Sequence, residues 1–194
     1  MPEQANLYQI LQANDEFVSN QKYKEYQTDK FPEKRMVILT CMDTRLVELL
    51  ERAMGISQGQ AKIIRVAGAQ VHHPFGSAMH SILIAVHMLE ADEVVVVAHH
   101  DCGMQSVERD VFVDKLIKRG ISPKTVSMME HAGIELDRWL HKFDNVYDSV
   151  KDTVSVIKNH PFLAEAGIPV HGLVIDPHTG KLELVVDGYK QTEK

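Results

Sequence analysis

The decisive stretch of the sequence is EVVVVAHHDC, residues 93–102. Its first six residues are mostly apolar and β-branched, which is typical of a strand with both faces buried. A second apolar run, residues 36–40, has the same character and ends directly before Cys41. Residues 61–66 predict a further strand. Two predicted strands therefore lead straight into cysteine or histidine, residue types that can bind metals or act in catalysis.

The rest of the chain supplies helices and a hairpin. Apolar residues recur at helical spacing in four segments: residues 6–20, 46–54, 76–89 and 111–160, the last interrupted at Gly120, Pro123 and Gly133. Strands are predicted at 171–176 and 181–186, on either side of the turn-forming sequence DPHTG. Strand and helix alternate early in the chain, so we predict an α/β fold, with a mixed, mainly parallel β-sheet flanked by helices and a C-terminal hairpin.

Length and composition narrow the possible functions. A chain of 194 residues suits one domain with a single core, spanning residues 1–194. The formal net charge of −6, with no cluster of lysine and arginine, argues against a nucleic-acid partner. Residues 1–10 lack the basic and apolar regions of a signal peptide, and no apolar run is long enough to cross a bilayer. We therefore expect a cytoplasmic protein without a membrane partner.

The chain has two cysteines, Cys41 and Cys102, which in a reducing compartment suit metal binding or catalysis better than a disulfide. Both follow predicted parallel strands, whose carboxyl ends gather ligands where the strand order reverses. Two thiolates and one imidazole suit zinc, and three protein ligands leave a fourth position open, as in catalytic sites. His99 and His100 compete for the imidazole role, and the spacing to Cys102 favours His99. The alternative is that both cysteines are ordinary buried thiols.

A second motif follows the first strand and reads Cys41-Met42-Asp43-Thr44-Arg45. A carboxylate beside zinc can accept the hydrogen of a bound water or ligate the metal itself. An arginine can hold such a carboxylate off the metal through a bidentate pair. Asp43 and Arg45 have the spacing for these roles. An equally good interpretation is that Asp43 or Thr44 caps the next helix and that Arg45 is solvated.

With these residues in view, the chain resembles the β-class carbonic anhydrases, and most closely a subgroup of short bacterial members. The family's pattern is Cys-x-Asp-x-Arg, then Ala-Gly after the second strand, then His-x-x-Cys-Gly. The matching residues are Cys41, Asp43, Arg45, Ala67, Gly68, His99, Cys102 and Gly103. The subgroup shares stretches such as CMDTRLVELL, HPFGS, HHDCGM and PVHGLVIDP. The resemblance extends from about residue 30 to the last residue of the sequence.

The resemblance implies a carbonic anhydrase (carbonate dehydratase), a zinc lyase that reversibly hydrates carbon dioxide to bicarbonate and a proton. It implies that Cys41, His99 and Cys102 bind Zn²⁺. It also implies that Asp43 and Arg45 form a catalytic dyad, and that Asp43 ligates the metal only in a closed form of the enzyme.

The resemblance further implies an obligate homodimer, which can pair into tetramers. Within the single domain, residues 1–30 are then a helical arm that packs on the dimer partner. The sequence departs from the family at two positions: Pro32 stands where many plant-type members have a glutamine, and Val66 replaces the usual asparagine before Ala-Gly. These departures bear on efficiency and substrate choice more than on metal binding.

Three residues have secondary roles in this hypothesis. Gly68 lets the loop after the second strand approach the site and line the substrate pocket; alternatively it is a simple turn glycine. A proton must leave after each turnover, and His100 or Asp101 could relay it. Either of these two residues is equally well interpreted as a plain surface residue.

Two rival functions stay open. The same zinc cage can hydrolyse carbon disulfide or carbonyl sulfide, or the chain could be a zinc-binding homologue without activity. Pro32 and Val66 favour the inactive homologue, whereas a purely structural site needs no pair such as Asp43 and Arg45. No Gly-x-Gly-x-x-Gly follows a predicted strand, which argues against a dinucleotide site.

Overall fold

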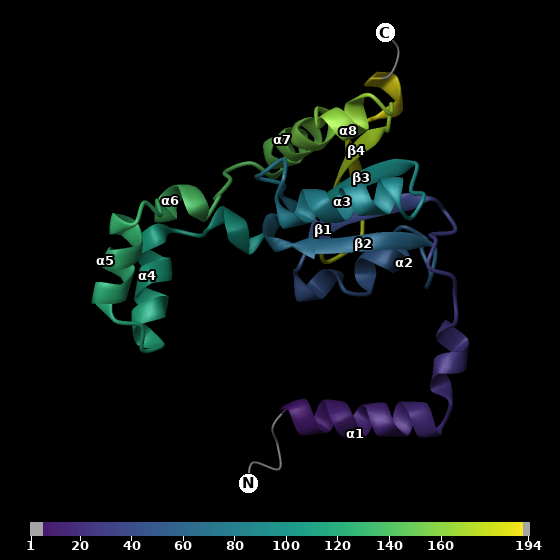
Figure 1. Cartoon of the computed structure of the whole chain (residues 1–194), viewed down its shortest axis with the longest axis horizontal. Coiled ribbons are helices and arrows are strands. Elements are labelled where there is room, and N and C mark those ends of the chain that lie inside the picture. The colour runs from purple at the N-terminus through teal and green to yellow at the C-terminus, as the bar shows by residue number, and fades with distance from the viewer. Residues whose placement is uncertain (1–5, 192–194) are drawn as a thin grey trace. The chain divides into compact units, whose positions relative to one another are not determined.

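The computed structural model describes residues 6–191, which form two compact units, one up to Lys30 and one from Phe31 onward (Figure 1). The first unit contains helix α1 (Asn6–Ser19) and a 3₁₀ turn at Lys22–Tyr26. No side chain of α1 is buried. The predicted helix over 6–20 is confirmed to within one residue. The prediction about a signal peptide falls partly on residues 1–5, which lie outside the described residues, and packing of residues 1–30 on a partner stays a prediction.

The second unit is built on a five-stranded sheet with the order β2-β1-β3-β4-β5. The strands are β1 (Met36–Cys41), β2 (Ala61–Val66), β3 (Glu93–His99), β4 (Val170–Ile175) and β5 (Leu182–Val186). Neighbouring strands are parallel except for β4 and β5, which form an antiparallel pair. The predicted mixed, mainly parallel sheet with a C-terminal hairpin is therefore confirmed.

The central strands are buried on both faces, as their unbroken apolar sequences predict. In β1 the side chains from Val37 to Cys41 are all buried, and so are those from Val94 to His99 in β3. Leu39 pairs in register with Ile64 of β2 on one side and with Val96 of β3 on the other. This double pairing fixes the ends of β1 and β3 at the same edge of the sheet.

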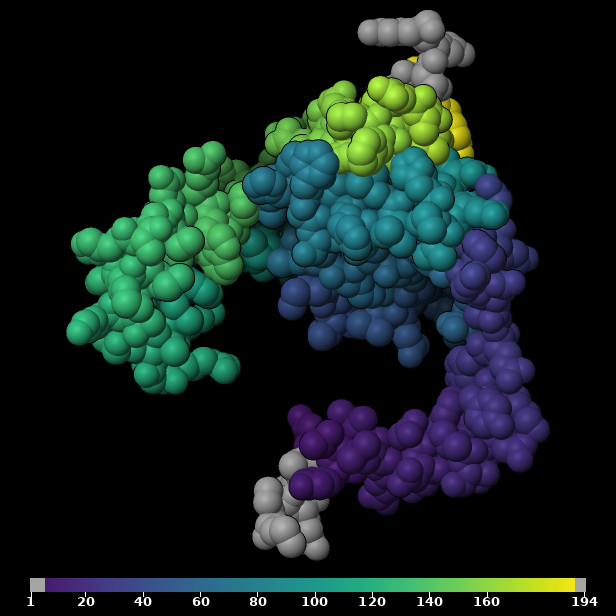
Figure 2. All heavy atoms as spheres, viewed as in Figure 1, coloured from purple at the N-terminus to yellow at the C-terminus, as the bar shows by residue number. Residues whose placement is uncertain are grey.

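The described part of the second unit also contains seven α-helices and several 3₁₀ turns. The helices are α2 (Leu49–Ala53), α3 (Ser77–His87), α4 (Arg109–Lys118), α5 (Pro123–His131), α6 (Leu136–Trp139), α7 (Val146–Lys158) and α8 (Pro161–Ala164). Helix α3 packs against β1 and β2, and α7 packs against β3, β4 and β5. The loop before α3 meets the start of α8 at Phe75 and His160, whose ring centroids are 5.2 Å apart. In Figure 2 the blue atoms of this part of the chain touch the yellow-green atoms of the α8 region.

Two helix predictions need correction. The helix expected over 46–54 is shorter, because residues 44–46 form a 3₁₀ turn and α2 begins only at Leu49. That turn is capped by the side chain of Asp43, which accepts a hydrogen bond from the Arg45 amide. The segment 111–160 has a further break at 140–145, where His141 takes a left-handed backbone conformation (φ 50°) and Asn145 caps the start of α7.

No helix in residues 6–191 has both the length and the apolar content that crossing a bilayer requires.

Helix α7 lies unusually close to β4 at Gly172. A Cβ atom added at Gly172 would be 2.6 Å from Val150 Cγ1 and 3.2 Å from Val154 Cγ2, both on α7. Close packing of the helix on the sheet therefore requires glycine at this position.

We predict that Gly172→Ala lowers the free energy of unfolding by about 1–3 kcal/mol, because the added methyl group forces α7 away from the sheet. Urea unfolding followed by circular dichroism measures the effect. Gly103→Ala is the matched control, since a Cβ at Gly103 meets no atom within 4 Å. Equal stability of Gly172→Ala and the wild type would show that α7 is not held at this distance.

Candidate metal centre

Three metal-binding side chains converge beyond the carboxyl ends of β1 and β3. Cys41 is the last residue of β1, His99 is the last residue of β3, and Cys102 follows three residues later. The chain adds β2 on one side of β1 and β3 on the other, so the strand order reverses between β1 and β3. Parallel α/β sheets bind ligands at this kind of crevice.

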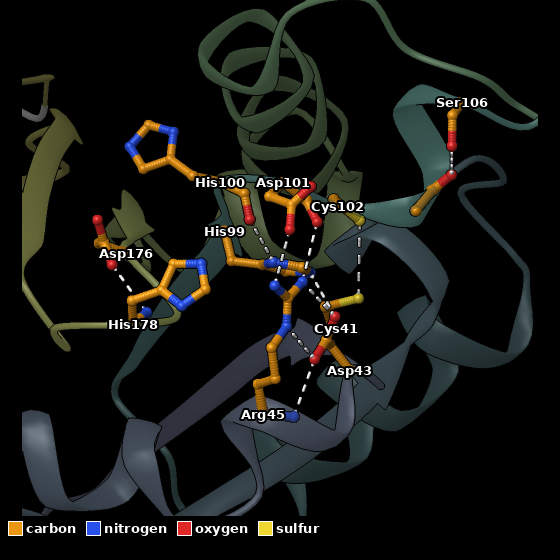
Figure 3. Close-up of polar contacts among 11 residues, drawn as sticks. Cys41, Asp43, Arg45, His99, His100, Asp101, Cys102, Ser106, Asp176 and His178 are labelled. Carbon is orange, nitrogen blue, oxygen red and sulfur yellow. Dashed lines mark hydrogen bonds and ion pairs between the residues drawn. The ribbon is translucent and has the colours of Figure 1, made fainter.

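The ligand atoms of Cys41, His99 and Cys102 all lie within 4.8 Å of one another, and all three residues are buried (Figure 3). Among residues 6–191 these form the one group of three or more His, Cys, Asp or Glu side chains with such a geometry. The two sulfur atoms are 4.0 Å apart. Two zinc–sulfur bonds at a tetrahedral angle place the sulfurs about 3.8 Å apart, so the donor set fits a tetrahedral cation.

The orientation of His99 also fits a metal ligand. Its Nδ1 lies 2.8 Å from the carbonyl oxygen of His100, so Nδ1 carries the proton and donates it there. Its Nε2 is buried and has no hydrogen-bond partner in the described part of the chain. Metal-binding histidines use this arrangement, in which the second nitrogen holds the ring by a hydrogen bond to a carbonyl group. The side chain of His100 instead lies beside Tyr147 and Glu183.

The two sulfur atoms compete for one negative charge when no cation is bound. The hydrogen bond from Cys102 to the Cys41 sulfur, together with the backbone amides of Asp43 and Gly68, lowers the pKa of Cys41 to about 4. The same contact with Cys41, together with burial, raises the pKa of Cys102. A divalent cation between the sulfurs would stabilise both as thiolates.

Arg45 holds the carboxylate of Asp43 on both oxygens. Oδ1 accepts hydrogen bonds from the Arg45 backbone amide (2.9 Å) and Nε (3.0 Å), and Oδ2 accepts one from Nη2 (2.9 Å). These contacts with Arg45 lower the pKa of Asp43 to about 2. Asp43 therefore caps the next turn, as one interpretation expected, but Arg45 is paired with carboxylates and not solvated. The catalytic role of Asp43 and Arg45 stays a prediction. Asp43 Oδ2 lies 3.8 Å from His99 Nε2, at the edge of the cluster.

Asp101 contacts Arg45 directly, although no pattern in the sequence indicates this contact. Arg45 Nη1 donates to Asp101 Oδ2 at 2.8 Å, and Nη2 donates to the Asp101 carbonyl oxygen at 2.9 Å. The turn between β4 and β5 also reaches this region, where Figure 3 shows Asp176 and His178. Asp176 holds that turn by accepting hydrogen bonds from the backbone amides of His178 and Thr179. The DPHTG sequence predicted the turn but gave no sign of its position near Arg45.

Gly68 lies against the cluster, and its predicted place in a substrate pocket stays a prediction. It has a left-handed backbone (φ 69°), and an added Cβ would be 2.7 Å from Gln70 Oε1 and 3.2 Å from Met104 Cγ. Its neighbour Ala67 lines an adjacent cavity of about 660 Å³, together with residues such as Trp139. Gly68 itself donates its backbone N–H to the Cys41 sulfur.

Residues 36–182 match the family of carbonic anhydrases. YtiB of Bacillus subtilis, which is provisionally named a carbonic anhydrase, is 53% identical over 183 residues, or 94% of this chain and 97% of YtiB. The chain belongs to the β-class carbonic anhydrase family.

Two further proteins that are similar to this chain carry the names of different activities. The crystal structure of β-carbonic anhydrase isoform I from Trichomonas vaginalis is similar with a TM-score of 0.84 at 30% identity, covering 95% of this chain and 100% of that chain. A carbon disulfide hydrolase from Acidithiobacillus thiooxidans is 26% identical over 158 residues, covering 77% of this chain and 76% of that protein. Membership of the family is therefore compatible with more than one substrate.

We predict that Gly68→Ala weakens metal binding and lowers the free energy of unfolding by about 1–2 kcal/mol, because alanine is strained at positive φ. Metal binding is weakened because the loop after β2 must move, and this takes the N–H of residue 68 away from the Cys41 sulfur. Competition with a chromogenic zinc chelator measures affinity. Gly120→Ala is the matched control: Gly120 also has a positive φ (95°) but lies in open space away from the sulfurs. Equal zinc affinity in the two variants would contradict the role of Gly68.

Proposed function

We propose that this chain binds one Zn²⁺ ion through Cys41, His99 and Cys102 and catalyses the reversible hydration of carbon dioxide to bicarbonate and a proton. The observation that carries the proposal is the convergence of two sulfurs and an unpartnered imidazole nitrogen beside a clamped carboxylate. A purely structural zinc site uses four protein ligands, whereas three leave a position open for chemistry.

Zinc bound by this set would supply a Lewis acid that makes a water molecule acidic enough to give a hydroxide nucleophile near neutral pH. Asp43 then orients that nucleophile. With its pKa lowered to about 2, Asp43 is ionised at neutral pH and can only accept hydrogen bonds. The nucleophile must donate its hydrogen to Asp43, which leaves its lone pair directed at carbon dioxide.

The contacts of Asp43 indicate which oxygen does this. Oδ1 already accepts from two donors of Arg45, whereas Oδ2 accepts from one. A carboxylate oxygen has about two lone-pair sites, so Oδ2 keeps one free. Oδ2 is also the oxygen that lies 3.8 Å from His99 Nε2. The free acceptor therefore lies beside the cluster.

The proton relay stays a prediction for His100 and Asp101. The side chain of Asp101 is 77% exposed but is paired with Arg45. His100 is partly exposed and faces Glu183, with Nε2 3.8 Å from Glu183 Oε1. These contacts support His100 over Asp101 as a group that passes the proton to solvent.

Hydrolysis of carbon disulfide or carbonyl sulfide is the alternative, and it is supported by the carbon disulfide hydrolase among the relatives. Turnover of carbon dioxide, carbon disulfide and carbonyl sulfide by the same zinc-loaded preparation separates these functions. One zinc per chain with no turnover of any of the three would support a non-catalytic homologue.

We also propose that the active form is a homodimer or a tetramer of two dimers, with residues 1–30 packed on the partner, and that it acts in the cytoplasm.

We predict that Cys41→Ser abolishes both zinc binding and carbon dioxide hydration, because the hydroxyl group of serine does not replace a thiolate ligand. Zinc content by atomic emission and hydration by stopped-flow indicator assay measure the two effects. Circular dichroism controls for folding. Retention of one tightly bound zinc per chain in this variant would contradict the assignment of Cys41 as a ligand.

We predict that Asp43→Asn keeps zinc but lowers kcat/KM for hydration about 100-fold, as expected when a polar group that orients the reacting atoms is lost. Asparagine presents an N–H donor and cannot accept through both side-chain atoms. Asp110→Asn, on the exposed side of α4, is the control for loss of one negative charge. Loss of zinc from Asp43→Asn would instead identify Asp43 as a permanent ligand.

A further inference from the structure

Arg45 connects the two loops that carry the proposed ligands. On one side it holds Asp43 through Nε and Nη2, and on the other it holds Asp101 through Nη1 and Nη2 (Figure 3). Asp43 belongs to the loop after Cys41, and Asp101 lies between His99 and Cys102. The guanidinium group is therefore shared between two carboxylates and one carbonyl oxygen.

The backbone of Asp101 explains how one residue makes two of these contacts. Asp101 has a left-handed conformation with φ 53°. Aspartate and asparagine adopt this conformation more readily than most other residues. It turns the chain between His99 and Cys102 so that the carbonyl group and the carboxylate of Asp101 both reach Arg45.

We infer that Asp101 is a positioning residue, which fixes the guanidinium of Arg45 so that Arg45 keeps Asp43 off the metal. This inference rests on the proposed zinc site. The carboxylate oxygen Oδ2 of Asp43 lies 3.8 Å from His99 Nε2, so a divalent cation at the cluster would attract it strongly. What opposes that attraction is the set of hydrogen bonds from Arg45, and these require the guanidinium to stay in one place.

Asp101 supplies that restraint. Without its carboxylate, Nη1 of Arg45 loses its acceptor, and the partly exposed arginine gains the freedom to turn toward solvent. Asp43 then exchanges Arg45 for the cation and fills the fourth position. The Asp101 side chain is itself 77% exposed, so its ion pair contributes little to folding. Loss of the Asp101 side chain should therefore change the coordination of the metal and leave the free energy of unfolding nearly unchanged.

The first measurement is activity of zinc-loaded variants. Asp101→Gly removes the carboxylate while tolerating the positive φ, and we expect kcat/KM for hydration to fall about five- to tenfold. Asp101→Asn keeps an oxygen acceptor and tolerates the same backbone, so it should recover part of the loss. Asp110→Ala removes a different exposed pair, with Arg109 (Nη1–Oδ1 2.8 Å), and should leave activity unchanged.

The second measurement does not depend on activity. Cobalt(II) takes the place of zinc in thiolate and imidazole sites and gives a visible spectrum that responds to an added anion at an open position. We expect thiocyanate to change the spectrum of the cobalt-loaded wild type, and the apparent Kd to rise about five- to tenfold in Asp101→Gly. In an Asp43→Asn background, which has no carboxylate to fill the position, Asp101→Gly should leave the thiocyanate Kd unchanged.

The outcomes separate this inference from the proposed function. If the wild type binds neither zinc nor cobalt, the proposed function fails. If the wild type binds metal and hydrates carbon dioxide, but Asp101→Gly has the wild-type thiocyanate Kd, the inference about Asp101 is overturned. If the effect of Asp101→Gly is the same with and without Asp43, Asp101 acts on folding of the loop and not through Arg45 and Asp43.

Discussion

The parallel pairing of β1 with β3 is the constraint on which the site depends. Cys41 is 58 positions from His99, and only the side-by-side ends of these two strands bring them within reach of one ion. Both strands are buried on both faces, so their register is fixed by core packing and not by the metal. The sheet thus sets the positions of the three side chains, so a cation that binds there would need little rearrangement of the chain.

The balance of charge around the three side chains is a second constraint on the site. The two sulfurs lie 4.0 Å apart, and the carboxylates of Asp43 and Asp101 both pair with one permanent cation, Arg45. Backbone N–H groups of Asp43 and Gly68 stabilise one thiolate, but not two without a cation. The arrangement therefore has a deficit of positive charge at the position between the sulfurs. Arg45 cannot fill it, because its guanidinium is already held by two carboxylates.

Much of this architecture could be predicted from the sequence, for a physical reason. Apolar, β-branched runs specify buried strands almost regardless of context, so β1, β2 and β3 were found to within one residue at either end. Side-chain caps are harder to predict: the apolar spacing gave no sign that Asp43 caps a 3₁₀ turn ahead of α2. The break at 140–145 depends on a left-handed residue, His141, which is not marked by glycine. The contact of Asp101 with Arg45 joins two loops, so no local pattern encodes it.

The departure from the family at Val66 can now be interpreted through the backbone. The carbonyl group of Val66 accepts a hydrogen bond from the Met42 amide at 3.1 Å, which ties the loop after Cys41 to the end of β2. Any residue can make that contact, so valine preserves the position of the ligand loop although it lacks the amide side chain of asparagine. The same holds for the N–H groups that reach the Cys41 sulfur. The Cys41 sulfur is thus positioned largely by main-chain contacts, and the side chain of Val66 instead lines the cavity beside the site.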